Sequence, residues 1–122
     1  MSWEVEYTDE FGTWWDELDE AAQDDVAHAV EILAAEGPHT PFPISSAIRA
    51  SRHQHMRELR IQSSGKPIRV LYAFDPRRCA ILLLGGDKTG DDRWYEVNVP
   101  IADRLYDEHL ASLRREGLIA EP

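Results

Sequence analysis

The stretch MRELRIQSSGKPIRVLYAFD, residues 56–75, decides the fold. Residues 56–62 and 67–75 are rich in the Leu, Ile, Val and Tyr side chains typical of strands, and residues 63–66 between them favour a turn. A further run of the same kind, 79–87, follows turn-forming residues at 75–78. The pattern predicts three consecutive antiparallel strands.

The register of the first hairpin places two arginines side by side. If the turn spans residues 63–66, Arg60 lies directly opposite Arg69 on one face of the sheet. The apolar side chains then share the other face, which should carry the helices: Leu59, Ile61, Ile68, Val70 and Tyr72. An opposed pair of like charges destabilises a sheet by up to about 1 kcal/mol. Either Glu58 nearby or an external phosphate would offset this cost, and the sequence leaves both explanations open.

The first part of the chain has a different pattern of apolar residues. Residues 3–7 alternate between apolar and polar, which predicts a short strand. Apolar residues then recur every three or four positions, which predicts two helices joined by almost no loop. The first begins after the N-cap Thr8 and ends near Leu18, and the second extends from Asp19 to Gly37.

The remaining segments complete the predicted topology. Residues 38–54 hold three prolines and no clear period, so we expect a connecting loop. A final helix is predicted from about Pro100 to Glu116, ended by Gly117. The order β-α-α-β-β-β-α across residues 1–122 indicates one α+β domain, with helices packed on one face of a small, mainly antiparallel sheet.

Charge is distributed unevenly along the chain. The net charge is −10, and residues 1–46 contain twelve Asp or Glu and no Lys or Arg. Residues 47–95 contain ten Lys or Arg against five Asp or Glu. A basic middle segment with acidic flanks is typical of an anion-binding surface. The alternative is that these cations pair with the acidic N-terminal helices.

The sequence also indicates a cellular location. Cys79 is the one cysteine, which fits a reducing compartment. The N-terminus lacks the basic and apolar regions of a secretion signal, and no apolar run is long enough to cross a bilayer. We therefore expect a cytoplasmic protein with no membrane partner.

Several motifs, taken in order, resemble one family. They are Ser51–Arg60, Ile68–Asp75, Ile81–Lys88 with Arg93-Trp-Tyr95, Ile101–Tyr106, and His109-Leu110. Together they resemble the HigB-like, phage-derived branch of the RelE/ParE toxin superfamily of type II toxin–antitoxin systems, and the similarity spans nearly the whole chain. ParE-like members share this fold but act on gyrase, so the fold alone leaves the activity open.

The resemblance implies an endoribonuclease that cleaves mRNA, usually on the ribosome, and so inhibits translation. In such toxins the ribose 2′-OH attacks the adjacent phosphorus without a metal or other cofactor, leaving a cyclic phosphate and a 5′-OH. It also implies a co-encoded helix-turn-helix antitoxin in a hetero-oligomeric complex. We expect that partner to cover the basic face around Arg60 and Arg69.

The resemblance also implies roles for individual residues. The resemblance implies catalytic roles for Arg69, Lys88 and Tyr95, and we add Arg60, which lies beside Arg69 in the hairpin, and His55, whose imidazole can shuttle protons. For RNA binding we expect Arg57, His53, Arg93 and Trp94, the last by stacking on an unpaired base. No metal site is implied, since His53 and His55 have no clustered third ligand. The two histidines could instead be ordinary solvated loop residues.

Glu58 departs from the family pattern. RelE-type enzymes have a lysine at the matching position, so the charge is inverted here. Two alternatives to a ribonuclease therefore remain. One is a gyrase-directed toxin of the ParE type, and the other is a catalytically weak toxin that acts only as the binding partner of its antitoxin.

Overall fold

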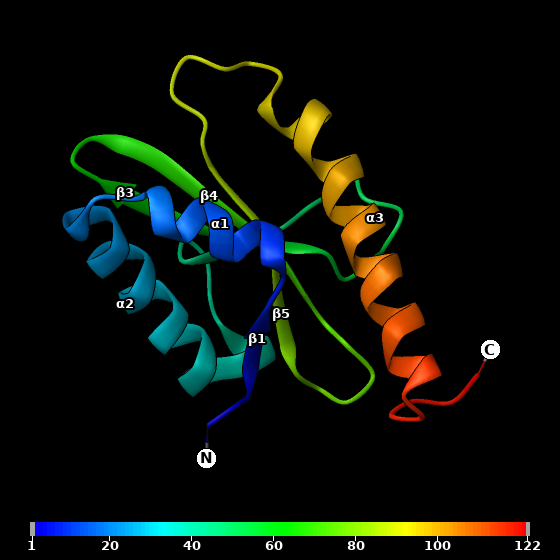
Figure 1. Cartoon of the computed structure of the whole chain (residues 1–122). Coiled ribbons are helices and arrows are strands. Elements are labelled where there is room, and N and C mark those ends of the chain that lie inside the picture. Colours follow the sequence, from blue (N-terminus) through cyan, green and yellow to red (C-terminus); the bar gives the residue numbers. More distant parts are fainter. Residues whose placement is uncertain (1, 122) are drawn as a thin grey trace.

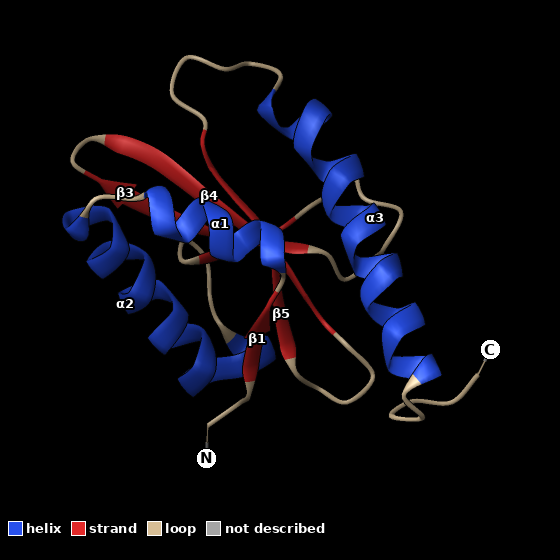
Figure 2. Cartoon of the chain, in the orientation of Figure 1, coloured by secondary structure: helices blue, strands red, loops and turns tan. Residues whose placement is uncertain are grey.

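The computed structural model describes residues 2–121 and shows a five-stranded sheet with three α-helices (Figures 1 and 2). The elements in chain order are β1 (Val5–Tyr7), α1 (Asp9–Glu17), α2 (Glu20–Glu36), the short 3₁₀ helix η1 (Gly37–His39), β2 (Ser45–Ala47), β3 (Arg57–Ser63), β4 (Lys66–Phe74), β5 (Ala80–Asp87) and α3 (Trp94–Arg115). The predicted α+β class is confirmed.

The sheet has the strand order β1-β5-β4-β3-β2. β1 is parallel to β5, and every other neighbouring pair is antiparallel. The predicted register of the β3–β4 hairpin is confirmed, because Arg60 pairs with Arg69. β2 is an addition, since it lies within the segment 38–54 that was expected to be a loop. It is only three residues long and carries no periodic signal.

Helices α1 and α2 cover one face of the sheet. Thr8 caps α1 by accepting a hydrogen bond from the Phe11 amide, and Asp19 caps α2 in the same way. The apolar faces of both helices pack on the side chains of β3 and β4 that were expected to meet them, and also on Ala80 and Leu82 of β5. This core includes Phe11, Val26, Leu33, Leu59, Ile61, Ile68, Val70 and Tyr72.

Helix α3 corrects two expectations. It begins at Trp94 instead of near Pro100, and it packs on the opposite face of the sheet from α1 and α2 (orange in Figure 1). The prediction that all helices share one face is therefore wrong. The physical reason is that β4 and β5 are buried on both faces, and their alternate residues Leu71 and Leu83 form a second core with α3. Pro100 is exposed and is the seventh residue of the helix, so it removes one backbone hydrogen bond from the helix interior.

Two glycines at the end of β5 allow both helical layers to approach the strand closely. A Cβ atom on Gly85 would lie 2.3 Å from the Trp14 ring of α1, and one on Gly86 would lie 2.6 Å from the Trp94 indole of α3. Each indole therefore rests directly on the backbone of β5.

Helices of the kind that cross a bilayer, both long and apolar, are not found among residues 2–121.

Candidate functional site

Three side chains that converge on the carboxylate of a fourth residue form the strongest candidate site. Glu58 of β3, Arg69 of β4 and Tyr95 of α3 meet on the face of the sheet that α3 covers. The Tyr95 hydroxyl donates to Glu58 Oε1 at 2.6 Å, and Arg69 Nε lies 3.5 Å from the same oxygen. Arg60 Nη1 lies 3.6 Å from Glu58 Oε2. We call Glu58, Arg60, Arg69 and Tyr95 the Glu58 cluster.

The Glu58 cluster explains how two arginines can face each other on adjacent strands. Glu58 is 4% exposed and Arg69 is 5% exposed, so both charges are removed from water and neutralise each other. Arg69 also donates to the Ile68 carbonyl at 3.0 Å. Of the two explanations left open by the sequence, the internal carboxylate is the one observed. Arg60 is the more accessible cation, because 35% of its side chain is exposed.

Tyr95 supplies a phenol with altered acidity. Burial and the hydrogen bond to Glu58 raise the pKa of Tyr95 above its ordinary value, although Arg69 acts in the other direction. Tyr95 therefore keeps its proton at neutral pH. The Lys88 ammonium lies 5.9 Å from the centroid of the Tyr95 ring, so this predicted residue also borders the cluster.

An open hollow of about 330 Å³ lies beside the cluster and gives it contact with solvent. Glu58 and Tyr95 line the hollow, together with Arg49 from the segment before β3. A carboxylate, a protonated phenol and nearby guanidinium groups can accept a proton, donate a proton and offset negative charge. The sequence did not single out Arg49, because an isolated arginine in a loop carries no periodic or motif signal.

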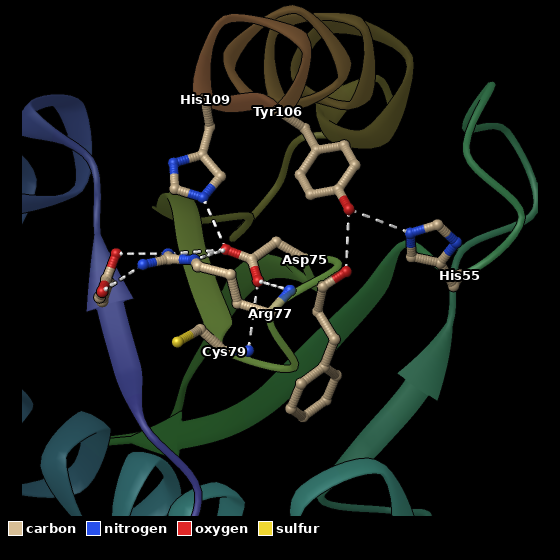
Figure 3. A network of polar contacts seen from close by, with 8 residues as sticks. His55, Asp75, Arg77, Cys79, Tyr106 and His109 are labelled. Atoms are coloured by element: carbon tan, nitrogen blue, oxygen red, sulfur yellow. Dashed lines mark hydrogen bonds and ion pairs between the residues drawn. The ribbon is translucent and has the colours of Figure 1, made fainter. Parts of the chain in front are cut away.

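The two histidines lie elsewhere. His55 Nε2 is 3.3 Å from the Tyr106 hydroxyl (Figure 3), and His53 Nε2 is 2.9 Å from Asp107 Oδ1. Tyr106 follows Tyr95 by eleven positions on α3, which corresponds to about 16 Å along the helix axis. The structure therefore does not bring His53 or His55 into the Glu58 cluster.

The remaining predicted RNA-binding residues are also dispersed. Arg57 lies on the other face of β3, where its Nε donates to Ser45 Oγ at 2.9 Å. Arg93 is exposed and pairs with Glu96 at 3.1 Å. Trp94 is only 5% exposed and packs on Gly86, so its indole is not accessible to a base in this conformation.

A second polar network surrounds Asp75, directly after β4 (Figure 3). The Asp75 side chain is fully buried and accepts hydrogen bonds from Arg77 Nη2 at 2.7 Å and His109 Nε2 at 2.9 Å. Arg77 also pairs with Glu6 of β1 at 2.9 Å. The sequence indicated only a turn at residues 75–78. The network connects β1, the β4–β5 turn and α3, so its role is to hold these elements together.

Among the described residues, one group of side chains could hold a metal ion. It consists of Glu4, Glu6 and Cys79, whose ligand atoms lie within 4.8 Å of one another. Glu6 is already paired with Arg77. Burial raises the pKa of the Cys79 thiol, which disfavours the thiolate that a metal requires. We therefore assign no metal to this group.

The fold and the Glu58 cluster define a small α+β protein with a polar site between two adjacent strands and the first turn of a helix. Residues 13–107 match the family described as "Phage derived protein Gp49-like (DUF891)". The chain belongs to this family, and the resemblance to HigB-like, phage-derived toxins is confirmed.

Two relatives from Mycobacterium tuberculosis (strain ATCC 25618 / H37Rv) carry toxin names. The chain is 42% identical over 100 residues to the protein named "Putative toxin HigB2", a match that covers 80% of this chain. It is 45% identical over 100 residues to the one named "Putative toxin HigB3", which covers 81% of this chain. The chain spans 50% of the length of the first relative and 86% of the length of the second.

Proposed function

We propose that this protein is the toxin of a type II toxin–antitoxin system and that it cleaves mRNA without a metal ion. The observation that carries the proposal is the Glu58 cluster, which lies beside an open hollow in a chain of the Gp49-like family. Relatives named as HigB toxins support the toxin role. The hollow supports access of a nucleotide to a carboxylate and a phenol.

The proposed reaction needs one group to remove a proton and another to supply one. The ribose 2′-oxygen forms a bond to the adjacent phosphorus, and its proton passes to the Glu58 carboxylate. The bond from phosphorus to the 5′-oxygen breaks, and that oxygen takes a proton from the Tyr95 phenol. Because Tyr95 donates to Glu58 at 2.6 Å, the proton on Glu58 can then return to Tyr95. The products are a 2′,3′-cyclic phosphate and a 5′-OH.

The arginines divide their tasks according to exposure. Arg60 is partly exposed and would offset the negative charge that builds up on the phosphorus oxygens. Arg69 is buried and would hold Glu58 and Tyr95 in position through its Nε atom. Arg49, which lines the hollow, and Lys88, which lies near the Tyr95 ring, would contact flanking phosphates. This arrangement assigns no proton transfer to His55.

The wider proposal concerns partners. The substrate is mRNA, bound on the ribosome, and a co-encoded helix-turn-helix protein is the antitoxin in a hetero-oligomeric complex in the cytoplasm. The structure changes our expectation of where that antitoxin binds. Arg69 is buried under α3 and neutralised by Glu58, so the Arg60/Arg69 face is a weak target for an acidic partner.

One observation favours a second candidate function. Glu58 neutralises the cations that a ribonuclease would direct at a phosphate, which fits a catalytically weak toxin that only binds its antitoxin. Induction of the protein separates the alternatives. Growth arrest with early loss of intact mRNA supports the ribonuclease, and arrest with DNA damage and intact mRNA supports a gyrase-directed toxin. Normal growth supports the weak toxin.

The cleavage proposal is tested with purified protein, an mRNA and ribosomes, using primer extension to locate and quantify the cuts. Glu58→Gln and Arg69→Ala are expected to lower the rate by 100-fold or more, and Tyr95→Phe by about 10- to 100-fold. Glu58→Gln and Tyr95→Phe preserve side-chain shape, but Glu58→Gln leaves the buried Arg69 with a neutral partner, so each variant is compared with the wild type only at a temperature at which it is folded.

The matched control is Arg104→Ala, which removes an exposed arginine of α3 that pairs with the exposed Glu108. It is expected to cleave like the wild type. Thermal unfolding of every variant checks the fold. Unchanged cleavage in both Glu58→Gln and Arg69→Ala would remove the Glu58 cluster from the mechanism, even if the wild-type protein is an active ribonuclease.

A further inference from the structure

Two adjoining hollows lie at the N-terminal end of α1, away from the Glu58 cluster. One, of about 640 Å³, is lined by residues of α1 and the end of β1, and the other, of about 450 Å³, lies between the start of α1 and the second half of α3. Tyr7 and Asp9 line both hollows and join them. We call this joined surface the Tyr7 groove.

Aromatic rings form the apolar part of the Tyr7 groove. Tyr7 is 67% exposed, which is unusual for a large aromatic side chain. Its ring centroid lies 5.8 Å from that of Phe11, which is stacked against Trp15 at 6.4 Å. Gly12 also lines the hollow, next to the Tyr7 ring, and has no side chain to fill the space. A partner could therefore insert an apolar side chain here.

The charged residues of the groove all have the same sign. Asp9, Glu10, Asp16 and Glu108 line it, together with His109, whose ring is hydrogen-bonded to Asp75, and none of the described residues that line it is a lysine or an arginine. The groove also lies in the acidic part of the chain, where residues 1–46 have twelve Asp or Glu and no Lys or Arg. Such a field repels nucleic acids and anionic membranes, and it attracts a cationic partner.

We propose that the Tyr7 groove is a docking site for a cationic segment of the antitoxin, in which an apolar side chain is flanked by lysines or arginines. The choice of partner depends on the toxin role proposed above. Aromatic side chains in a recess supply binding energy, and the surrounding carboxylates supply specificity and a fast encounter. The partner would leave the hollow beside Glu58 uncovered, because different residues line the two surfaces.

The test measures binding of the co-encoded antitoxin to the full-length toxin by calorimetry. Asp16→Lys reverses an exposed charge in the groove and is expected to weaken binding about 10-fold or more. Gly12→Leu fills the recess and is expected to have a similar effect. The control is Glu31→Lys, an exposed charge reversal on α2 outside the groove, which should bind within about 2-fold of wild type.

The outcomes separate this inference from the proposed function. If Asp16→Lys and Glu31→Lys bind equally well, the groove is not the docking site. Failure of the wild-type toxin to bind the antitoxin also overturns the inference, whereas loss of mRNA cleavage alone overturns only the ribonuclease. The toxin alone is also studied by sedimentation. If it self-associates and Asp16→Lys abolishes this self-association, the groove binds a second copy of this chain instead.

Discussion

At the scale of single residues, Asp75 shows how one buried charge can hold several elements. Its carboxylate has no exposed surface and receives hydrogen bonds from Arg77, His109 and the Cys79 amide. Burial acts to raise the pKa of Asp75, but the hydrogen bonds from Arg77 and His109 outweigh it, so the pKa is lower than usual. The charged form is therefore the one that stabilises the fold.

Replacing Asp75 by Asn should lower the free energy of unfolding by about 2–3 kcal/mol, because a fully buried group loses the charge that accepts hydrogen bonds from Arg77 and His109, and Arg77 keeps only Glu6 as a charged partner among the described residues. Urea denaturation followed by circular dichroism measures this. Asp107→Asn is the matched control, since that carboxylate is 43% exposed and pairs at the surface with Arg52 and His53. It should cost less than about 1 kcal/mol. Equal losses would show that Asp75 has no special structural role.

The lowered pKa of Asp75 also predicts a pH dependence of stability. A group whose pKa is lower in the folded state stabilises the protein above its unfolded pKa, about 3.9 for aspartate, and the contribution is lost as the pH falls through the folded value. The stability difference between wild type and Asp75→Asn should be constant above about pH 5 and should shrink below about pH 4. Urea titrations between pH 2 and pH 7, a range set around that unfolded value, measure it. A constant difference at all pH values would contradict the prediction.

At the scale of elements, the close approach of α1 and α3 to β5 depends on the absence of two side chains. A Cβ atom on Gly86 would lie 2.6 Å from the Trp94 indole, closer than real contacts allow. Trp94 begins α3, which also carries Tyr95. The Glu58 cluster therefore depends on the packing of Gly86 as well as on its own polar contacts.

Gly86→Ala should destabilise the fold by about 1–3 kcal/mol, because the Trp94 indole must move. It should also reduce mRNA cleavage more than its effect on stability explains, because Tyr95 moves with Trp94. Gly12→Ala is the control, since its new Cβ atom makes only an ordinary contact and alanine favours a helix. Denaturation and cleavage are measured on both proteins. A stable, fully active Gly86→Ala would show that α3 adjusts without disturbing the site.

At the scale of the whole molecule, the net charge of −10 is carried mainly by the layer of α1 and α2. Repulsion among these carboxylates opposes the compact state. The strongest ion pairs are buried or half-buried, as in the pairs of Glu58 with Arg69 and of Asp75 with Arg77, so salt screens them less than it screens the surface.

Raising the ionic strength from about 0.01 M to about 0.3 M should therefore increase the melting temperature by a few degrees. Differential scanning calorimetry measures the change. Asp24→Lys should reproduce part of this increase in melting temperature at low salt, because the substitution removes one exposed acid of α2 and adds a cation. A melting temperature that falls with salt would mean that exposed ion pairs outweigh the repulsion.

Periodicity and turn residues predicted most of the fold. The β3–β4 hairpin and its arginine pair follow from the alternation of residues 56–75, and the caps Thr8 and Asp19 marked the helix starts. β2 was missed because three residues carry no period. The early start of α3 was missed because Pro100 is typical of a first turn, and its position on the second face depends on tertiary packing.

The candidate site was predicted less completely. The sequence paired Arg60 with Arg69 and named Tyr95, which belongs to the same cluster, and Lys88, which borders it. It could not place His53 and His55 beside Tyr106 and Asp107, because those contacts join a loop to the far half of a helix. The burial of Trp94 could not be predicted from the sequence for a similar reason, since it depends on packing against Gly86 of β5.

The glycine pair at the end of β5 has a consequence for how this sequence can change over time. Gly85 and Gly86 each match an indole from a different helix, one seventy-one positions earlier at Trp14 and one eight positions later at Trp94. A larger residue at either glycine is tolerated only together with a smaller ring at its tryptophan partner. In related toxins, each glycine and its tryptophan partner should therefore change together.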